Sequence, residues 1–477
     1  MGTLNEYDLI IIGSGSATNL LDALISRNPK IKIAIIDKDE PGGICLTRGC
    51  IPSKILLYSA EIVRTVEEAK ELGVEIEIKN IDFPRIMNRM RALIGSGIDS
   101  IREGLSSSPN IDYYHTIAEF VSPYTLKVEE KTIKSKMIIL CVGSKAIIPP
   151  IENLESVGFI TSDTILNLNS LPESVAIVGG GYIAAEYGHF LASMGSKVTI
   201  IGRNKRFLPN EEPEISSLAK RELGKHITIL TNCEVKKATK TSAGLKKLIS
   251  INRETGKEHF VEAQEIMIAS GRGPVTDILH PERAGIKTTK DGWIEVDEYF
   301  ETSQPNVWSF GDADGMYLFR HVANYESEIA YYNAILKKRV KVDYHAVPHA
   351  VFTYPEIASV GLQEKDAVEK YGKDAILVGF YKYENTAKGE AINAKDYFVK
   401  VIVDGSDQRI LGAHIIGPWA SILIQEIVNV MYTEGMSYDI IDRAIHIHPA
   451  MNEVVQRAFG SLMPVEHYHE RGLTEME

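Results

Sequence analysis

Two cysteines separated by four residues, Cys45 and Cys50, are the pair in this sequence best suited to redox chemistry. They lie within residues 42–54, GGICLTRGCIPSK, where Pro52 suits the first turn of a helix. Apolar residues recur at helical spacing from 56 to 66, so we expect a helix that begins at Cys50. The positive end of that helix favours a thiolate, and one helical turn brings the two sulfurs to bonding distance. Two reduced, buried thiols are the ordinary alternative, but the glycines, the proline and the lysine favour a redox-active disulfide.

Length and charge narrow the class of protein. A chain of 477 residues suggests about three domains of roughly 150 residues. The net charge of −12 argues against a nucleic-acid partner, and no apolar run reaches the ~20 residues that span a bilayer. The first residues show no secretory signal, so we expect a cytoplasmic protein, and there a close cysteine pair is more often catalytic than structural. Cys141 and Cys233 lie in apolar runs and are expected to be buried thiols.

A first glycine turn follows the apolar run 9–12. The turn contains Gly13 and Gly15, a helical pattern follows, and a second apolar run ends at Asp37. Strand, glycine turn, helix, strand and acid form the dinucleotide-binding pattern, in which backbone N–H groups approach a pyrophosphate and the acid binds a ribose. Thr18 stands where this pattern has a third small residue, which loosens helix packing slightly.

A second glycine turn, with Gly179 and Gly181, follows the run 175–178 and precedes a helix and the run 197–201. Either turn alone is a weak signal, because a tight strand-to-helix turn has the same composition. Two such turns in one chain predict two dinucleotides.

The residues after the run 197–201 bear on the choice of nicotinamide cofactor. An acid there would bind the ribose diol of NAD, but residues 202–206 read GRNKR. Arg203 and Arg206 suit a 2′-phosphate, because planar guanidinium groups match phosphate oxygens. We therefore favour NADP over NAD; a solvated basic loop is the alternative.

A histidine near the C-terminal end completes the candidate chemistry. Pro449 is expected at a helix start, which places His448 just before the helix and Glu453 about one turn into it. A hydrogen bond from Glu453 would fix the tautomer of the His448 ring and raise its basicity. His446 lies two residues earlier in an extended stretch, so we expect it to point elsewhere and be structural.

Taken together, these motifs resemble the flavin-dependent pyridine nucleotide-disulfide oxidoreductases of class I, which include dihydrolipoamide dehydrogenase, mycothione reductase and mercuric reductase. The resemblance implies an α/β fold with two Rossmann-like domains, for FAD and for NAD(P), and a C-terminal α+β dimerisation domain. The implied segments are an FAD domain at 1–150, an NAD(P) domain at 151–272, a segment 273–344 that completes the FAD domain, and an interface domain at 345–477.

The resemblance also assigns roles to residues. Cys50 is the cysteine nearer the flavin, Cys45 exchanges with substrate, and His448 with Glu453 serves as acid and base to the dithiol of the other subunit. Lys54 is paired with Glu186 beside the flavin. The implied cofactor-binding residues are Gly13, Gly15, Asp37, Lys54, Gly143, Asp312, Gly179, Gly181, Tyr182, Glu186, Arg203, Arg206 and Gly271. Tyr182 matches the residue that covers the nicotinamide face of the flavin, and no metal is expected.

The expected activity is electron transfer between NAD(P)H, FAD, the Cys45–Cys50 disulfide and a small thiol substrate in a homodimer. Residues 49–54, GCIPSK, resemble dihydrolipoamide dehydrogenase, which implies a 2-oxoacid dehydrogenase complex as partner. Residues 182–186, the basic loop and residues 448–450 are closer to mycothione reductase, an NADPH-dependent reductase of a low-molecular-weight disulfide. Mercuric reductase fits poorly, because no C-terminal cysteine pair is present. A flavoprotein diaphorase or oxidase, or a structural subunit without thiol catalysis, is the alternative class, and residues 463–477 receive no role.

Overall fold

The computed structural model describes residues 4–472, which form two compact units. The first unit contains residues 4–55, 85–147 and 271–343, and the second contains residues 56–84, 148–270 and 344–472. Each is described separately below. The segment boundaries proposed from the sequence stay a prediction.

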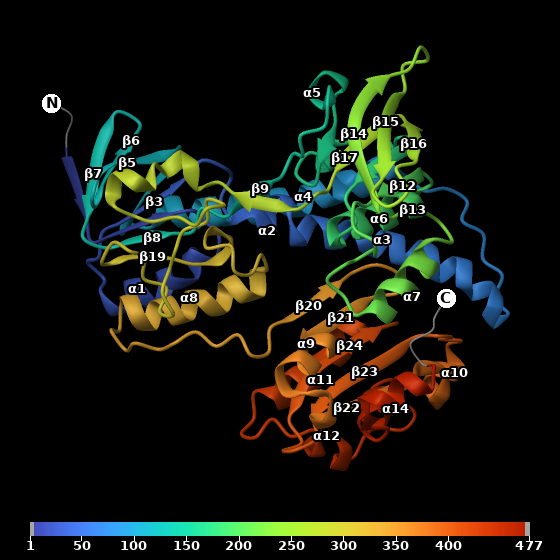
Figure 1. The fold of residues 1–477 in the computed structure, drawn as a ribbon. Coiled ribbons are helices and arrows are strands. Elements are labelled where there is room, and N and C mark those ends of the chain that lie inside the picture. The colour runs from blue at the N-terminus through green and yellow to red at the C-terminus, as the bar shows by residue number, and fades with distance from the viewer. Residues whose placement is uncertain (1–3, 473–477) are drawn as a thin grey trace. The chain divides into compact units, whose positions relative to one another are not determined.

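The first unit is built on a parallel sheet whose strands run in the order β19, β8, β2, β3, β4. Figure 1 labels β19, β8 and β3 of this sheet. Their bounds are Val307–Ser309, Ile138–Leu140, Leu9–Ile12, Ile33–Asp37 and Ile111–His115. Every residue of β2 is buried, as expected for a parallel strand covered on both faces. The first glycine turn follows β2 at the carboxyl end of this sheet, which is where open α/β sheets bind ligands.

Smaller elements complete the first unit. An adjoining sheet has the order β1, β7, β6, β5, with bounds Leu4–Tyr7, Lys131–Ser135, Thr125–Val128 and Ala118–Ser122. A short antiparallel ribbon joins β9 (Ser144–Ala146) to β18 (Arg272–Pro274). The helical segments beside the glycine turn and the cysteines are η1 (Ser16–Leu20), α1 (Leu21–Arg27), α2 (Gly43–Arg48) and α8 (Arg320–Ala334).

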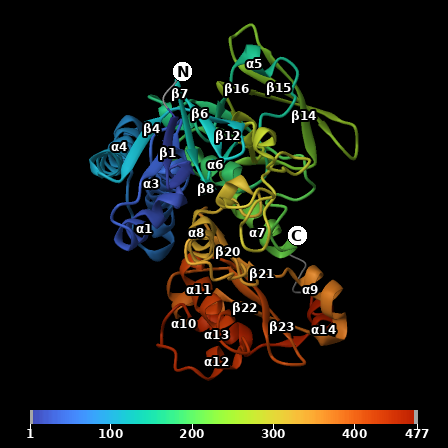
Figure 2. The same ribbon diagram turned by 90° about the vertical axis from the view of Figure 1, so that its left-hand side faces the viewer.

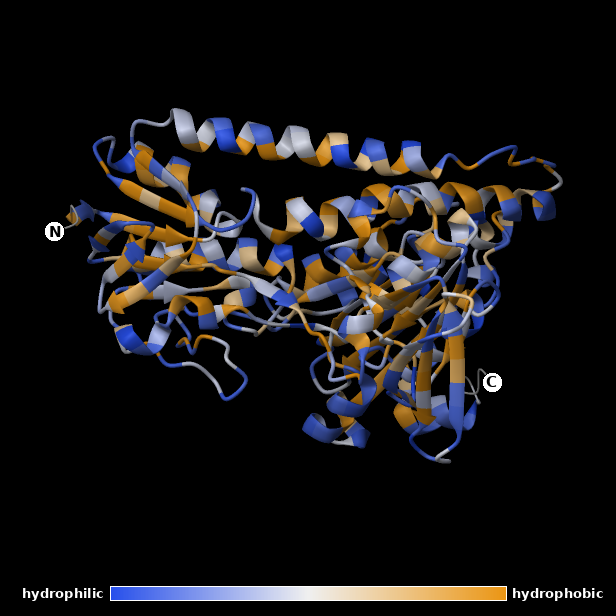
Figure 3. Ribbon diagram, turned by 90° about the horizontal axis from the view of Figure 1, so that it is seen from above, coloured by the Kyte–Doolittle hydropathy of each residue, from blue (hydrophilic) through white to orange (hydrophobic). Residues whose placement is uncertain are grey.

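The helix expected to begin at Cys50 is present, and a second long helix follows it after an interruption. Helix α3 (Cys50–Ala69) is followed by η2 (Lys70–Leu72), and α4 (Phe83–Ser107) begins only after residues 73–82. Gly73, at a φ of 80°, ends η2 in the left-handed conformation that stops helices. Figure 3 shows blue and orange residues alternating along α4, the amphipathic pattern that buries one side of a helix.

The second unit contains another parallel sheet, in the order β10, β17, β11, β12, β13. Its strands span Ile160–Thr161, Glu265–Ile268, Ser174–Val178, Lys197–Ile201 and Thr228–Leu230. The second glycine turn joins β11 to α6 (Tyr182–Met194), which repeats the arrangement of the first sheet. Around it lie α5 (Leu154–Val157), α7 (Pro213–Leu223) and the antiparallel strands β14 (Cys233–Lys240), β15 (Lys246–Asn252) and β16 (Glu258–Ala263).

The C-terminal part of the second unit is an antiparallel sheet in the order β20, β21, β24, β23, β22, β25. Strands β20, β21, β24, β23 and β22 are labelled in Figure 1, and Figure 2 shows this part turned by 90°. The strands span Pro348–Val351, Ile357–Gly361, Ile410–Ile416, Phe398–Asp404, Ile376–Lys382 and Met463–Pro464. Its helices are α9 (Glu364–Tyr371), α10 (Ala387–Ala391), α11 (Ala420–Met431), α12 (Asp439–Arg443), α13 (Glu453–Phe459) and α14 (Val465–Glu470). The apolar faces of α11 and α13 pack with β23 and β24 in one continuous core. The α/β class with two Rossmann-like sheets and a C-terminal α+β part is therefore confirmed.

The final segment is more ordered than its polar sequence suggested. Strand β25 pairs with β22, and the Tyr468 side chain on α14 is fully buried. The segment therefore belongs to the folded core as far as Gly472; residues 473–477 of the segment left without a role lie outside the described range.

Candidate active site

The two cysteines meet where one short helix ends and a long one begins. Cys45 lies on α2, Cys50 is the first residue of α3, and Gly49 separates the helices. A Cβ atom at Gly49 would lie 2.9 Å from the carbonyl oxygen of Ile44, so only glycine permits this approach. Neither cysteine forms a disulfide in this structure; Cys45 is half-buried and Cys50 is exposed. The predicted helix start at Cys50 is confirmed.

A hydrogen bond between the two side chains raises the pKa of the Cys45 thiol, and burial raises it further. The sulfur of Cys50 therefore shares the proton of Cys45 while standing at the positive end of α3, where a thiolate is favoured. The arrangement therefore favours a thiolate at Cys50 and a protonated thiol at Cys45.

Arg320 adds a positive charge that the sequence reading missed. It is the first residue of α8, and its charge lowers the pKa of Cys45 against three larger effects: the hydrogen bond to Cys50, burial and the charge of Cys50. Its Nη1 lies 3.7 Å from the position that a Cβ on Gly15 would take. The guanidinium group thus lies between the first glycine turn and the dithiol.

The first glycine turn forms a cradle that fits a dinucleotide. A Cβ on Gly43 would lie 2.7 Å from the Cα of Gly15, so the two loops touch through backbone alone. The N–H and the hydroxyl of Ser14 donate to Asp37 Oδ2 at 2.8 and 2.5 Å, which fixes the acid at the end of β3. Bare backbone beside a fixed carboxylate suits the pyrophosphate and ribose of FAD.

Asp312, one of the residues expected to bind the cofactor, lies just after β19 in the short helix η6 (Gly311–Ala313). Burial raises the pKa of Asp312, although a 2.5 Å hydrogen bond from Ser144 and the charge of Arg272 oppose this. Arg272 Nε in turn donates to Ser144 Oγ at 2.8 Å. Gly143 and Gly271, the neighbours of Ser144 and Arg272, both adopt positive φ, at 73° and 112°. Three residues predicted separately therefore belong to one hydrogen-bonded corner.

The second glycine turn repeats the first in the second unit. A Cβ on Gly179 would lie 2.1 Å from the carbonyl oxygen of Ala269, whereas Gly181 has open space around it. Gly181 caps α6, and Tyr182 is its first residue. Gly202 also lacks room for a side chain, because a Cβ there would lie 3.3 Å from the Cα of Gly180.

The basic loop after β12 is exposed along its whole length from Arg203 to Arg206. Arg253, in the turn after β15, donates to the carbonyl oxygen of Arg203 at 3.1 Å. A third guanidinium group therefore lies beside the loop. The sequence did not predict it, because Arg253 is distant from the loop along the chain. The cluster has the charge that a 2′-phosphate requires.

His448 and Glu453 are in contact, as expected. His448 Nδ1 lies 3.0 Å from Oε1 and 3.2 Å from Oε2 of Glu453, and this hydrogen bond lowers the pKa of Glu453. The expected helix start was wrong: α13 begins at Glu453, and Pro449 lies in a preceding turn. Glu453 then also accepts the N–H of Ala450, so its carboxylate ties that turn together. His446 points elsewhere, to Glu426 at 3.0 Å.

Lys54 and Glu186 lie in different units and are described separately. Lys54 is half-buried near the start of α3. Glu186 is buried on α6, where its Oε1 accepts the N–H of Phe352 at 3.0 Å. Their proposed ion pair stays a prediction.

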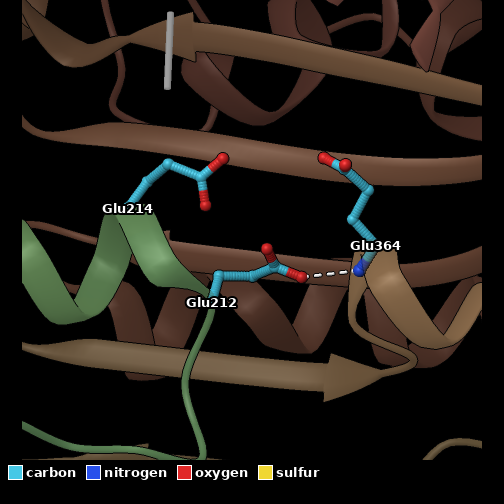
Figure 4. A group of neighbouring side chains, drawn as sticks. All are labelled: Glu212, Glu214 and Glu364. Carbon is cyan, nitrogen blue, oxygen red and sulfur yellow. Dashed lines mark hydrogen bonds between the residues drawn. The ribbon is translucent and has the colours of Figure 1, made fainter. Parts of the chain in front are cut away.

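Three buried carboxylates in the second unit converge closely enough to suggest a metal site. Figure 4 shows Glu212, Glu214 and Glu364 facing a common centre. Lys400 Nζ lies 2.9, 2.8 and 2.8 Å from one oxygen of each. The lysine ammonium thus supplies the positive charge of this cluster, which has the character of a structural ion network.

Comparison with known proteins identifies the class. The profile of the family described as pyridine nucleotide-disulphide oxidoreductase matches residues 7–335, and that of its dimerisation domain matches residues 347–459. The chain belongs to this family, whose members are FAD-dependent disulfide oxidoreductases that use NAD(P)H. The dimerisation domain accords with a homodimer. Among residues 4–472, none of the helices combines the length and apolar character that a bilayer crossing requires.

Individual relatives cover nearly the whole chain. Mycothione reductase of Mycobacterium tuberculosis (strain ATCC 25618 / H37Rv) is 32% identical over 466 residues, covering 95% of this chain and 99% of that protein. Dihydrolipoyl dehydrogenase of Synechocystis sp. is 33% identical over 471 residues, covering 95% and 98%. The solved structure of the HOCl-induced flavoprotein disulfide reductase RclA from Escherichia coli matches with a TM-score of 0.83 at 28% identity, covering 95% and 99%.

Proposed function

We propose that this protein interconverts a small dithiol and its disulfide through Cys45 and Cys50, in the manner of dihydrolipoamide dehydrogenase. The observation that carries the proposal is the hydrogen-bonded cysteine pair at the start of α3, beside the glycine cradle. FAD, when bound in that cradle, would exchange two electrons between a nicotinamide and the cysteine pair. Everything else in the mechanism is the work of this chain's side chains.

The exchange step balances with the residues at hand. His448 takes the proton of the Cys45 thiol, and the resulting thiolate attacks one sulfur of a disulfide substrate to form a mixed disulfide. The other substrate sulfur leaves as a thiolate and takes that proton back from His448. Cys50 then attacks Cys45, which releases the second substrate thiol and forms the Cys45–Cys50 disulfide. Oxidation of a dithiol runs these steps backwards, with His448 accepting the proton. Glu453 holds the His448 ring through Nδ1, which leaves Nε2 to carry the proton.

The thiol relay is tested with Cys45→Ser, and Ser107→Ala serves as control because Ser107 is exposed at the C-terminal end of α4. We expect Cys45→Ser to lose disulfide turnover by at least ~10³-fold while retaining NAD(P)H-dependent reduction of an artificial dye. Unchanged disulfide turnover in Cys45→Ser would leave the protein a diaphorase or oxidase in which the cysteines take no part.

For the nicotinamide cofactor we propose NADP. The support is the exposed cluster of Arg203, Arg206 and Arg253, together with the lack of an acid in residues 202–206. Initial rates with NADPH and NADH at equal concentration test this. A faster rate with NADH would reject the proposed 2′-phosphate site. If Arg203→Ala no longer distinguishes NADPH from NADH, that site includes Arg203.

The same basic cluster favours one second candidate, an NADPH-dependent reductase of a low-molecular-weight disulfide like mycothione reductase. Turnover on lipoamide, glutathione disulfide and mycothione disulfide, ranked by kcat/KM, separates the two candidates. Preference for lipoamide would also make a 2-oxoacid dehydrogenase complex the natural partner to test by co-purification. The cytoplasmic location stays a prediction.

A further inference from the structure

Strand β20 borders the first turn of α6 at two points within the second unit. The rings of His349 and Tyr182 lie with centroids 6.2 Å apart and planes tilted by 40°. Three residues along, the N–H of Phe352 donates to Glu186, one helical turn after Tyr182. Strand β20 and the residue after it therefore run along the first turn of α6, and His349 places its ring against Tyr182.

His349 is itself held by a buried acid. Its Nε2 lies 2.7 Å from Oε1 of Glu211, and the other carboxylate oxygen of Glu211 accepts the Ser359 hydroxyl at 2.8 Å. Glu211 is only 1% exposed. Burial by itself raises the pKa of Glu211, but the hydrogen bond and charge of His349, with the Ser359 bond, lower it below the usual value. A buried, ionised carboxylate with both oxygens engaged leaves the histidine ring little freedom.

The chain of contacts thus runs from Ser359 through Glu211 and His349 to Tyr182. The two hydrogen bonds to the Glu211 carboxylate are made by His349 on β20 and Ser359 on β21, which are neighbouring strands. Such a chain transmits the rigidity of the sheet to an aromatic ring at a helix start. The Tyr182 side chain is also hydrogen-bonded to Asn210, and the His349 ring adds a second contact that limits the rotamers of Tyr182. Hydride transfer depends on such tightly held geometry.

We propose that His349 is a positioning residue of the nicotinamide site: clamped by Glu211, it holds the Tyr182 ring and so sets the rate of flavin reduction by the nicotinamide cofactor. The inference rests on the proposed function, and on the role beside the flavin that the family resemblance gives to Tyr182. It does not require that the cysteines act on any particular substrate.

The test compares the full-length holoenzyme with three variants, His349→Ala, Glu211→Gln and the double variant, and with His467→Ala as control. His467 is an exposed histidine on α14. Stopped-flow spectroscopy gives the limiting rate of flavin reduction and the Kd of NADPH. We expect the limiting rate to fall about tenfold or more in His349→Ala and in Glu211→Gln, with less than about threefold change in Kd. The double variant should be no slower than the slower single variant, because both changes break the same chain of contacts.

A second readout needs no turnover. With 3-fluorotyrosine at position 182, the ¹⁹F resonance should narrow or shift in His349→Ala and in Glu211→Gln, and stay unchanged in His467→Ala. Glu211→Gln keeps the volume of the glutamate side chain, so this variant can test the proposal even if His349→Ala does not fold. An unaltered limiting rate and an unaltered resonance in Glu211→Gln, or additive losses in the double variant, would overturn the proposal.

The two hypotheses fail separately. Flavin reduction is followed directly and with a dye acceptor, neither of which needs Cys45. A protein without disulfide turnover whose flavin reduction still depends on His349 would refute the proposed function and support this inference. A protein with disulfide turnover whose flavin reduction does not depend on His349 would support the proposed function and refute this inference.

Discussion

The carboxylate of Glu453 shows how one residue can shape a reactive neighbour. It receives His448 Nδ1 and the N–H of Ala450, so the turn that carries the histidine is fastened to the first residue of α13. The ring is therefore oriented before any substrate arrives, and its remaining nitrogen is the one available for proton transfer.

Replacing His448 by alanine should lower disulfide turnover by about 10²–10³-fold, the usual contribution of a positioned acid or base. Glu453→Gln should lower it less, because the amide still contacts the ring without stabilising its charged form. Steady-state rates with the preferred disulfide measure both effects. His446→Gln is the matched control, and an equal loss in that variant would remove the special role of His448.

Asp314 supplies a pH-dependent effect on stability. Burial, reinforced by the buried Glu326 carboxylate, raises the pKa of Asp314 to about 7. An unfolded aspartate titrates near 3.9, so between pH ~4 and ~7 the folded state holds a proton that the unfolded state has lost. The contribution of Asp314 to folding stability therefore falls as pH rises through this window and is at its lowest above pH ~7.

Asp314→Asn should remove this penalty. We expect the melting temperature of Asp314→Asn to exceed that of the unaltered protein by more at pH 8 than at pH 5, since the amide does not ionise. Thermal unfolding followed by circular dichroism at the two pH values measures the difference. Asp277→Asn changes an exposed aspartate in the same unit and should show no such trend; a pH-independent effect of Asp314→Asn would contradict the assignment.

At the scale of elements, the redox site depends on how closely short segments approach one another. Helix α2 can begin beside the first glycine turn because Gly43 and Gly15 meet through backbone, and α3 can begin beside Cys45 because Gly49 has no side chain. These contacts bring the cysteine pair to the edge of the dinucleotide cradle.

Gly43→Ala should therefore weaken FAD binding more than it weakens the fold. The new methyl group would lie 2.7 Å from Gly15, at a φ of 69° that alanine disfavours. The ratio of flavin to protein absorbance after purification measures the loss. Gly95→Ala is the control, since no atom lies within 4 Å of a Cβ there; it should keep its flavin and gain about 0.5–1 kcal/mol in helix stability.

The elements foreseen from sequence were those with local signals. Sequence patterns of about thirty residues or fewer predict the two glycine turns, the helix at Cys50 and the buried parallel strands. Arg320, Arg253 and the Glu211–His349 pair carry no such signal, because each acts on residues far away in the sequence. The start of α13 was misplaced because Pro449 suits a turn as well as a helix, and α14 was missed because its buried face contributes little beyond Tyr468 to an otherwise polar segment.

At the scale of the whole molecule, the Lys400 network joins segments distant in the chain. Glu212 and Glu214 precede and begin α7, Glu364 begins α9, and Lys400 lies on β23, all in the second unit. Lys400→Met would leave three buried carboxylates without their cation, which typically costs about 3–5 kcal/mol. Urea unfolding should show this loss, whereas Lys373→Met, at an exposed pair with Glu466, should change little.

A homodimer whose sites combine two subunits makes a distinct prediction. Cys45→Ser and His448→Ala should each be inactive alone, but mixed dimers of the two would contain one intact cysteine pair opposite one intact histidine. Co-expression with different affinity tags should therefore restore activity to about a quarter of normal for random pairing. Activity of the purified mixed dimer no higher than that of either parent would place the histidine and the cysteines in one subunit.

The first glycines of the two turns meet the same surroundings. Beside Gly13 a Cβ would find O, C and the next N of residues 141–142 at 2.1, 2.7 and 3.3 Å, and beside Gly179 it would find those of residues 269–270 at the same three distances. Each turn therefore requires glycine for the same reason: the main chain of a neighbouring segment leaves no space for any side chain.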